Sequence, residues 1–237
     1  MLVLWDVDNT LVDAGDLGTR LYESAFREMF GCELSAVAPK AGRTDRAITL
    51  DTLALAGVSA PGTQVDAFLA SLARQVAALD GRAGSPVVAL PGAAQALAAL
   101  DLAAPGSRGD RVRQSLLTGN IRPLAELNLH AAGLGAGLNF DVGAYGDVHE
   151  VRAELVDVAR RAAGSAYGAD FSGSATVLVG DTPLDVAAAL AAGARAVGVA
   201  TGSYSPDQLT AAGAHAVLPD LTDTARVLAA VSPQHRP

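Results

Sequence analysis

The sequence predicts an α/β fold, a Rossmann-like parallel sheet covered by helices, with an all-helical domain inserted near the N-terminus. The run Leu2–Trp5 is apolar enough to form a buried strand. From Pro91 onward, apolar segments of strand length alternate with segments of helical periodicity. Such alternation is typical of a parallel sheet with crossover helices, because each parallel connection needs a crossover long enough to hold a helix.

The first third of the chain predicts the inserted helical domain. Apolar residues in 17–30 share one helical face, and Gly31 is expected to end this helix. Two more helices are expected at about 43–56 and 64–78, followed by a connection rich in Gly and Pro. We therefore expect a cap domain at residues 14–88, and a core domain made of residues 1–13 and 89–237.

The remaining elements alternate along the core domain. Strands are expected at 112–119, 140–146 (a short strand or strand end), 175–181, 195–202 and 215–221. Helices are expected at 92–102, 121–134, 151–164, 182–194, 205–214 and 222–231. The segment 104–114, rich in Gly and Arg, is expected to be a solvated loop.

Composition excludes several classes of function. The formal net charge of -8 argues against binding to a nucleic acid polymer or an anionic membrane. We expect no secretory signal, and no apolar run in the sequence reaches membrane-spanning length. Cys32 is the only cysteine, which favours a reducing compartment, so we expect a cytoplasmic protein.

Polar groups stand where four of the predicted strands end. They are Asp6 and Asp8; Thr118, Gly119 and Asn120; Asp147, His149, Glu150 and Arg152; and Asp181 with Asp185. Each has an ordinary structural explanation when taken singly; Asp181, for example, can be the N-cap of the next helix. Together they indicate a site, because ligands of open parallel sheets bind outside the carboxyl ends of the strands.

The spacing of the acids indicates metal-assisted chemistry. Two carboxylates as close as those of Asp6 and Asp8 repel each other unless one is protonated or a cation lies beside them. Mg²⁺ takes oxygen ligands, commonly one or two carboxylates with water and substrate phosphate. A carboxylate can also attack phosphorus to form an acyl-phosphate, while a second acid protonates the leaving alcohol.

The motifs DVDNT, SLLTGN and VGDTPLD, in this order, resemble those of the haloacid dehalogenase (HAD) superfamily over essentially the whole chain. The resemblance implies a HAD-like core and a Mg²⁺ cofactor. It implies Asp6 as nucleophile and Asp8 as general acid/base, with both at the metal. It also implies Asp181 as a metal ligand, Asp185 as a second ligand or the support of that site, and Thr118 as a phosphate ligand, with Gly119 and Asn120 as further candidate phosphate-binding residues.

One family motif departs from the usual pattern. The family places a lysine at the start of the helix after the third strand, whereas the only lysine here, Lys40, lies in the inserted domain. Arg152 opens the helix in question and can bind two phosphate oxygens, so we expect it to replace the lysine. His149 is the alternative.

The resemblance also favours some of the reactions known in the family over others. Family dehalogenases lack an acid at the position of Asp8, which favours phosphate transfer, and family mutases carry a histidine about ten residues later that is absent here. The segment GRTDRAI resembles the specificity loop of phosphoglycolate phosphatase-like members, so Arg43 or Arg46 is a candidate substrate contact. Phosphonate cleavage needs a cap lysine that forms an imine, and only Lys40 offers one.

We therefore expect a Mg²⁺-dependent phosphatase acting on a small phosphorylated metabolite, such as a phosphoglycolate-like ester, a sugar phosphate or a nucleotide. The missing motif lysine keeps a second class open, a catalytically weak or inactive protein that binds a ligand or partner. Dinucleotide-binding and P-loop proteins are disfavoured, because no strand ends in their glycine-rich motifs. A receiver domain is disfavoured because no lysine follows late in the chain.

Overall fold

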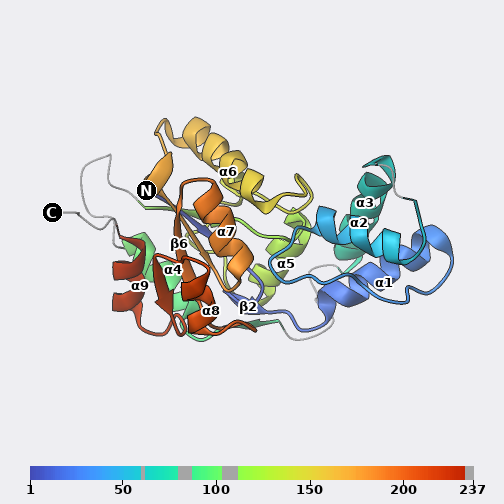
Figure 1. Ribbon diagram of the computed structural model, residues 1–237, viewed down its shortest axis with the longest axis horizontal. Helices are drawn as coiled ribbons and strands as arrows, with labels where there is room; N and C mark the ends of the chain where they lie inside the picture. The colour runs from blue at the N-terminus through green and yellow to red at the C-terminus, as the bar shows by residue number, and fades with distance from the viewer. Residues whose placement is uncertain (60–61, 80–86, 103–111, 233–237) are drawn as a thin grey trace.

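The computed structural model describes residues 1–59, 62–79, 87–102 and 112–232. Its core is a five-stranded sheet with the order β4-β1-β5-β6-β7, in which all neighbouring strands are parallel. The helices α1, α2 and α3 extend beyond one end of this sheet (Figure 1). The predicted fold class, a parallel α/β core with an N-terminal helical insertion, is confirmed.

The elements follow the chain in the expected alternation. The strands are β1 (Leu2–Trp5), β2 (Val12–Asp13), β3 (Val88–Ala89), β4 (Arg113–Leu116), β5 (Thr176–Gly180), β6 (Arg195–Val199) and β7 (Ala216–Leu218). The inserted helices are α1 (Leu17–Phe30), α2 (Asp45–Leu55) and α3 (Gly62–Ala78). The core helices are α4 (Ala93–Leu102), α5 (Arg122–Ala131), α6 (Arg152–Tyr167), α7 (Pro183–Ala191), α8 (Pro206–Ala211) and α9 (Thr224–Val231).

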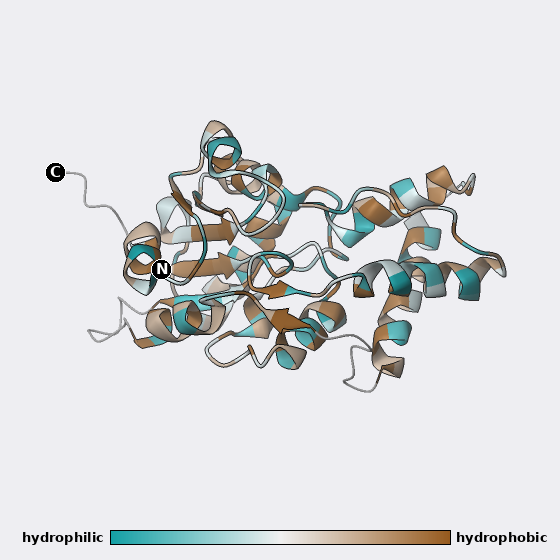
Figure 2. Cartoon of the chain, turned by 90° about the horizontal axis from the view of Figure 1, so that it is seen from below, coloured by the Kyte–Doolittle hydropathy of each residue, from teal (hydrophilic) through white to brown (hydrophobic). Residues whose placement is uncertain are grey.

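Side chains alternate between the two faces of the sheet along each strand, and helices cover both faces. Val3 and Trp5 of β1 face a hydrophobic cluster that includes α4, α5 and α9. Leu2 and Leu4 face a second cluster, which includes α6, α7 and α8. In Figure 2 the strands run as hydrophobic segments through the centre of the core. A parallel sheet covered in this way offers ligands only the ends of its strands.

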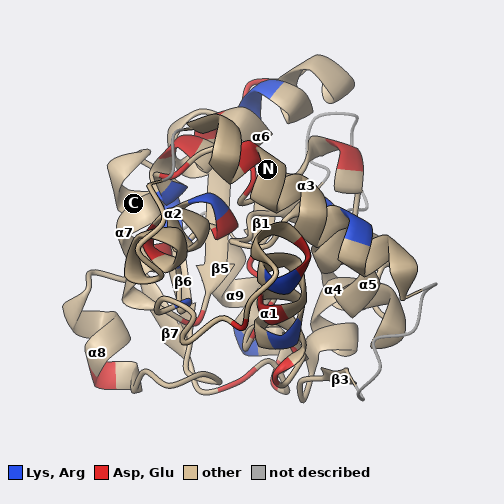
Figure 3. Cartoon of the chain, turned by 90° about the vertical axis from the view of Figure 1, so that its right-hand side faces the viewer, with Lys and Arg blue, Asp and Glu red and all other residues tan. Residues whose placement is uncertain are grey.

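The inserted helices α1, α2 and α3, called the cap below, pack against one another. Tyr22 of α1 packs against Phe68 of α3, with 5.4 Å between the ring centroids. The antiparallel pair β2 and β3 lies where the chain leaves and re-enters the core. Acidic and basic positions are interspersed over the end of the molecule that carries α1 (Figure 3). Within the described residues, no helix is long and apolar enough to cross a membrane.

One local expectation was wrong, one lies mostly beyond the described residues, and one strand pair was not expected. The segment 140–146 is not a strand: Phe140–Val142 form a 3-10 turn, because the side chain of Asn139 accepts a hydrogen bond from the Asp141 backbone. Only Ala144 makes a single parallel bridge, to Leu117. The pair β2–β3 was not predicted, because two-residue strands carry no periodicity. Most of the expected loop at 104–114 lies outside the described residues.

Candidate active site

Three buried carboxylates meet where β1 and β5 end. Oxygen atoms of Asp6, Asp181 and Asp185 lie within 4.8 Å of one another. Asp6 directly follows β1, and its backbone N–H still bonds the Val179 carbonyl of β5 at 2.8 Å. Because the strands are parallel and in register, their following residues come out at the same edge of the sheet. The sequence prediction that acids of distant motifs converge here is therefore met for these three.

Asp8 faces a different set of partners. The turn after β1 places Asn9 in the left-handed region, at φ 59°, and directs the side chain of Asp8 towards α5. Its Oδ2 accepts a hydrogen bond from Asn120 Nδ2 at 2.9 Å, and its Oδ1 accepts a longer one from Asn128 Nδ2 at 3.4 Å. Two amides thus hold the Asp8 carboxyl outside the cluster of three acids.

Arg152 is the cation of the acidic cluster. As the first residue of α6 it is only 7% exposed. Its Nη2 lies 2.6 Å from Asp6 Oδ1 and 2.6 Å from Asp185 Oδ1, and it also donates to the Leu117 carbonyl. Its Nε is buried without a hydrogen-bond partner. The sequence pointed to Arg152 over His149, and it is Arg152 that lies beside Asp6.

Asp185 has a structural role as well as a place in the cluster. Thr182 is the N-cap of α7, and its side chain and that of Asp185 bond each other's backbone N–H groups in a capping box. The N-cap is therefore Thr182, and the alternative of Asp181 as a cap is wrong. Asp181 instead receives a long hydrogen bond from Thr10 at 3.3 Å.

The loop after β4 is held by its own hydrogen bonds and by the neighbouring segment of the core. The N–H of Thr118, which is 1% exposed, bonds the Ala144 carbonyl, and its Oγ1 accepts from Asn120 N at 3.2 Å. Gly119 lies so close to the cap that a Cβ there would overlap the carbonyl of Arg43. Thr118, Gly119 and Asn120 therefore sit together at the strand end, as expected for a phosphate-binding loop.

Burial makes these acids resist ionisation. Desolvation raises the pKa of Asp6 well above its usual value, and the neighbouring Asp185 and Asp181 add to this effect against the opposing charge of Arg152. Desolvation, together with Asp185, raises the pKa of Asp181 to about 7. It also raises the pKa of Asp8, partly offset by the Asn120 hydrogen bond. A site with more carboxylates than cations favours binding of a cation.

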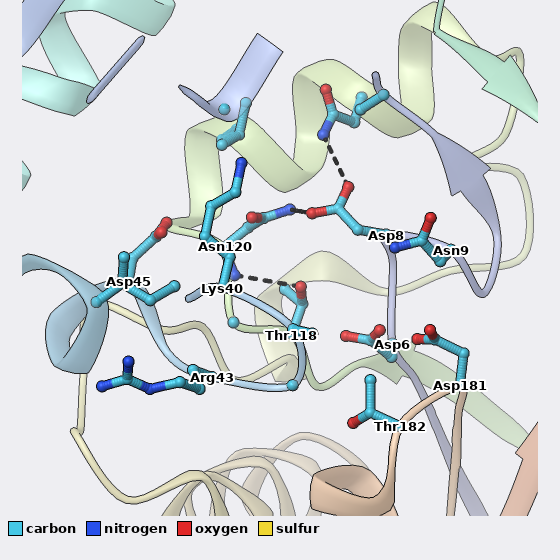
Figure 4. Close-up of a pocket in the computed structure, with 18 of the residues that line it drawn as sticks. Asp6, Asp8, Asn9, Lys40, Arg43, Asp45, Thr118, Asn120, Asp181 and Thr182 are labelled. Atoms are coloured by element: carbon cyan, nitrogen blue, oxygen red, sulfur yellow. Dashed lines mark hydrogen bonds between the residues drawn. The ribbon is translucent and has the colours of Figure 1, made fainter. Parts of the chain in front are cut away.

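A cavity of about 350 Å³ joins the acids to the cap. Asp6, Asp8 and Thr118 line its core side, while Lys40 and Asp45 line its cap side (Figure 4). The Lys40 ammonium donates to Thr19 Oγ1 at 2.7 Å, and its charge lowers the pKa of both Asp8 and Asp45 against their burial. The sequence kept Lys40 only as the candidate for an imine-forming lysine, and its place among the residues that line the cavity agrees with that position near the acids.

The cap arginines are engaged elsewhere. The guanidinium of Arg43 bonds Asp51 Oδ2 at 2.6 Å and two backbone carbonyls, and it points away from Asp6 in Figure 4. Arg46 donates to the Asp147 carbonyl of the core and pairs with Asp66. Arg43 is among the residues that line the cavity, but its guanidinium is bonded within the cap, and Arg46 is not a lining residue.

The arrangement of strands, acids and cap matches known folds. A family model described as HAD-hydrolase-like matches residues 153–224. The chain superimposes on a hydrolase from Pseudomonas syringae with a TM-score of 0.67 and 22% identity, covering 98% of this chain and 99% of that one. The fold is HAD-like. No curated protein sequence matches the chain.

Two other solved structures share the HAD-like fold. A "predicted phosphatase" from Clostridium acetobutylicum has a TM-score of 0.66 and 16% identity, with 96% of this chain and 98% of that one covered. A HAD family hydrolase from Deinococcus radiodurans, with bound phosphate and sodium, has a TM-score of 0.50 and 25% identity, with 97% and 94% covered. The HAD-like comparison therefore spans both the core and the cap.

Proposed function

We propose that this HAD-like protein is a Mg²⁺-dependent phosphatase that hydrolyses a small phosphate monoester through an aspartyl-phosphate intermediate. The observation that carries the proposal is the buried cluster of Asp6, Asp181 and Asp185 at the carboxyl ends of two parallel strands, beside Arg152. Phosphoryl transfer needs such a combination of an aligned carboxylate and neutralising charge.

The three carboxylates fit a hard divalent cation. Their oxygens lie within 4.8 Å of one another, and burial together with the neighbouring carboxylates raises the pKa of Asp6 and of Asp181, a cost that a bound cation would offset. Asp6 and Asp181 would hold Mg²⁺, with the backbone of Asp8 near it, and Asp185 would serve as a further ligand or as the support of that site. When bound, the ion draws the phosphate dianion into an acidic site and neutralises charge on its oxygens.

The proposed reaction has two steps, in which Asp6 is the nucleophile and Asp8 transfers the protons. In the first, an oxygen of Asp6 attacks phosphorus while the ester P–O bond breaks, and protonated Asp8 gives its proton to the leaving alkoxide. In the second, ionised Asp8 takes a proton from water, which attacks phosphorus, releases inorganic phosphate and restores Asp6. Arg152 steadies one oxygen of Asp6, and Thr118, Gly119 and Asn120 bind the phosphoryl oxygens.

The cap limits the size of the substrate. We propose that residues 14–88 form this cap and that residues 1–13 and 89–237 form the core. A cavity of about 350 Å³ between cap and core suits a small phosphorylated metabolite: a phosphoglycolate-like ester, a sugar phosphate or a nucleotide. Exclusion of water by the cap protects the acyl-phosphate from uncontrolled hydrolysis.

The test is phosphate release from a panel of small phosphate esters, with Mg²⁺ or with EDTA, by the native protein and Asp6→Asn. The variant keeps the shape of the side chain and removes the nucleophile. Asp157→Asn, at an exposed acid on α6, is the matched control. We expect Mg²⁺-dependent turnover that Asp6→Asn reduces by more than 1000-fold, roughly the loss of covalent catalysis. If the native protein binds the esters but none of the three proteins releases phosphate, the protein is a ligand-binding module and the proposal fails.

Cleavage of a carbon–phosphorus bond is the second candidate, because Lys40 lies in the cavity with Asp6. A lysine amine can form an imine with a carbonyl-bearing phosphonate. Borohydride would then reduce the imine and attach the ligand to the single lysine of the chain. Phosphate release from such a phosphonate, with mass labelling of Lys40, would favour this activity over ester hydrolysis.

A further inference from the structure

The docking contact between cap and core is centred on Asp45, the first residue of α2. Its backbone N–H donates to the Gly119 carbonyl at 2.7 Å, and its Oδ2 accepts from the Ile121 N–H at 2.8 Å. The carboxyl is 4% exposed and also receives a hydrogen bond from Tyr22 Oη at 2.9 Å. One cap residue thus bonds the peptide groups on both sides of Asn120.

Asn120 is in turn the closest partner of Asp8. Its Nδ2 donates to Asp8 Oδ2 at 2.9 Å, whereas the bond from Asn128 is longer, at 3.4 Å. The backbone of Asn120 is fixed on the core side through its carbonyl, which accepts from Gly146 N at 2.9 Å. The direction of the Asn120 side chain therefore depends on peptide groups that the cap holds.

Two glycines in the sequence allow the backbones of the cap and the core to approach this closely. A Cβ on Gly119 would overlap the Arg43 carbonyl, and a Cβ on Gly146 would overlap the Gly119 carbonyl and lie against Asp45 N. Any other residue at either glycine would separate the cap from the loop. Three segments distant in the sequence meet here without intervening side chains.

We propose that Asp45 is a positioning residue that couples docking of the cap to placement of the proton donor. Its two bonds fix residues 119–121, and Asn120 then holds Asp8 where a leaving alkoxide receives its proton. When the cap is open, these bonds are absent and Asp8 loses its best-aligned support. The inference rests on the proposed function, because it assigns Asp8 the proton transfer.

The coupling makes a distinctive kinetic prediction. An alkyl ester needs its leaving oxygen protonated, whereas a dinitrophenolate leaves without a proton. General acid catalysis contributes roughly 100- to 10,000-fold. We expect Asp45→Ala to lower kcat for glycerol phosphate about 100-fold, and to lower it for 2,4-dinitrophenyl phosphate less than about 3-fold. A residue that merely stabilised the cap would affect both esters equally.

Two further variants separate positioning from docking. Asp45→Asn retains a carbonyl oxygen that can accept from Ile121 N–H, so it is expected to recover most of the alkyl-ester activity. Arg46→Gln weakens a different cap–core contact, to the Asp147 carbonyl, and is expected to lower turnover of both esters by the same factor. Equal losses for the two esters in Asp45→Ala, or no loss, would overturn the proposal.

Hydrogen–deuterium exchange tests the contact without relying on activity. In the native protein, peptides covering residues 118–122 are expected to exchange slowly, and in Asp45→Ala at least 10-fold faster; in Arg46→Gln they are expected to remain slow. Unchanged exchange in Asp45→Ala would overturn the positioning role even if the enzyme is active. If the native protein hydrolyses neither ester with Mg²⁺, the proposed function fails, while faster exchange in Asp45→Ala still supports the contact.

Discussion

Replacing Asp181 by Asn should stabilise the metal-free protein at pH 8. Burial and the neighbouring Asp185 raise the pKa of Asp181 from 3.8 to about 7. A group whose pKa is higher in the folded state contributes stability below its unfolded pKa, and this contribution is lost as the pH rises through the folded value. At pH 8 the ionised carboxylate therefore opposes folding, and an uncharged isostere removes that cost.

The magnitude follows from the size of the shift. One pKa unit corresponds to about 1.36 kcal/mol, so a rise from 3.8 to about 7 gives a ceiling of ~4 kcal/mol. Asp181 is 3% exposed, so solvent screens the effect little. Replacing Asp181 also changes the pKa of the neighbouring Asp6, so the free energies of the two groups are not additive. We expect a gain of about 1–4 kcal/mol in the free energy of unfolding.

Urea denaturation at pH 8, with EDTA or with saturating Mg²⁺, measures this gain. Mg²⁺ at 100 times its Kd would stabilise the native protein by ~2.7 kcal/mol, and the variant by much less, because one ligand is lost. Asp157→Asn, at an exposed acid, should change either value by less than about 0.5 kcal/mol. An Asp181→Asn protein that is less stable than native with EDTA, or that responds equally to Mg²⁺, would refute the reasoning.

Three further predictions concern the same edge of the sheet. The melting temperature of the metal-free protein should fall between pH 5 and pH 8, because burial raises the pKa of Asp45 to about 6 and that of Asp181 to about 7. Calorimetry with EDTA measures this fall, and a melting temperature that does not change with pH would contradict the prediction. Arg152→Met should destabilise the metal-free protein at pH 8 by about 3–5 kcal/mol, because the buried carboxylate of Asp6 loses its ion-pair partner. Urea denaturation measures this loss, and an unchanged free energy of unfolding would contradict a stabilising ion pair. Gly119→Ala should lower kcat/KM about 100-fold, because its Cβ displaces the cap; exchange protection of residues 118–122 should fall with it.

Local pattern was enough to predict the architecture. Strand and helix periodicities differ, and apolar strands alternating with helices allow few topologies other than a parallel sheet. The same topology predicted that acids following β1 and β5 would meet, since parallel strands end at one edge. Boundaries were less well determined: 140–146 carries apolar residues suited to a strand, yet a local Asn139 hydrogen bond makes a 3-10 turn there.

The sequence by itself therefore determined the fold class and the convergence of Asp6, Asp181 and Asp185 at the proposed site, because these depend on local periodicity and on residues close to strand ends. Only the tertiary structure decided what the cap contributes. Lys40 and Asp45 face the core because the inserted helices fold back across the sheet edge, while Arg43 pairs within the cap. Contacts between segments distant in the sequence, such as Asp45 with Ile121, 76 residues apart, leave no periodic signal, since they depend on how the inserted helices dock on the sheet.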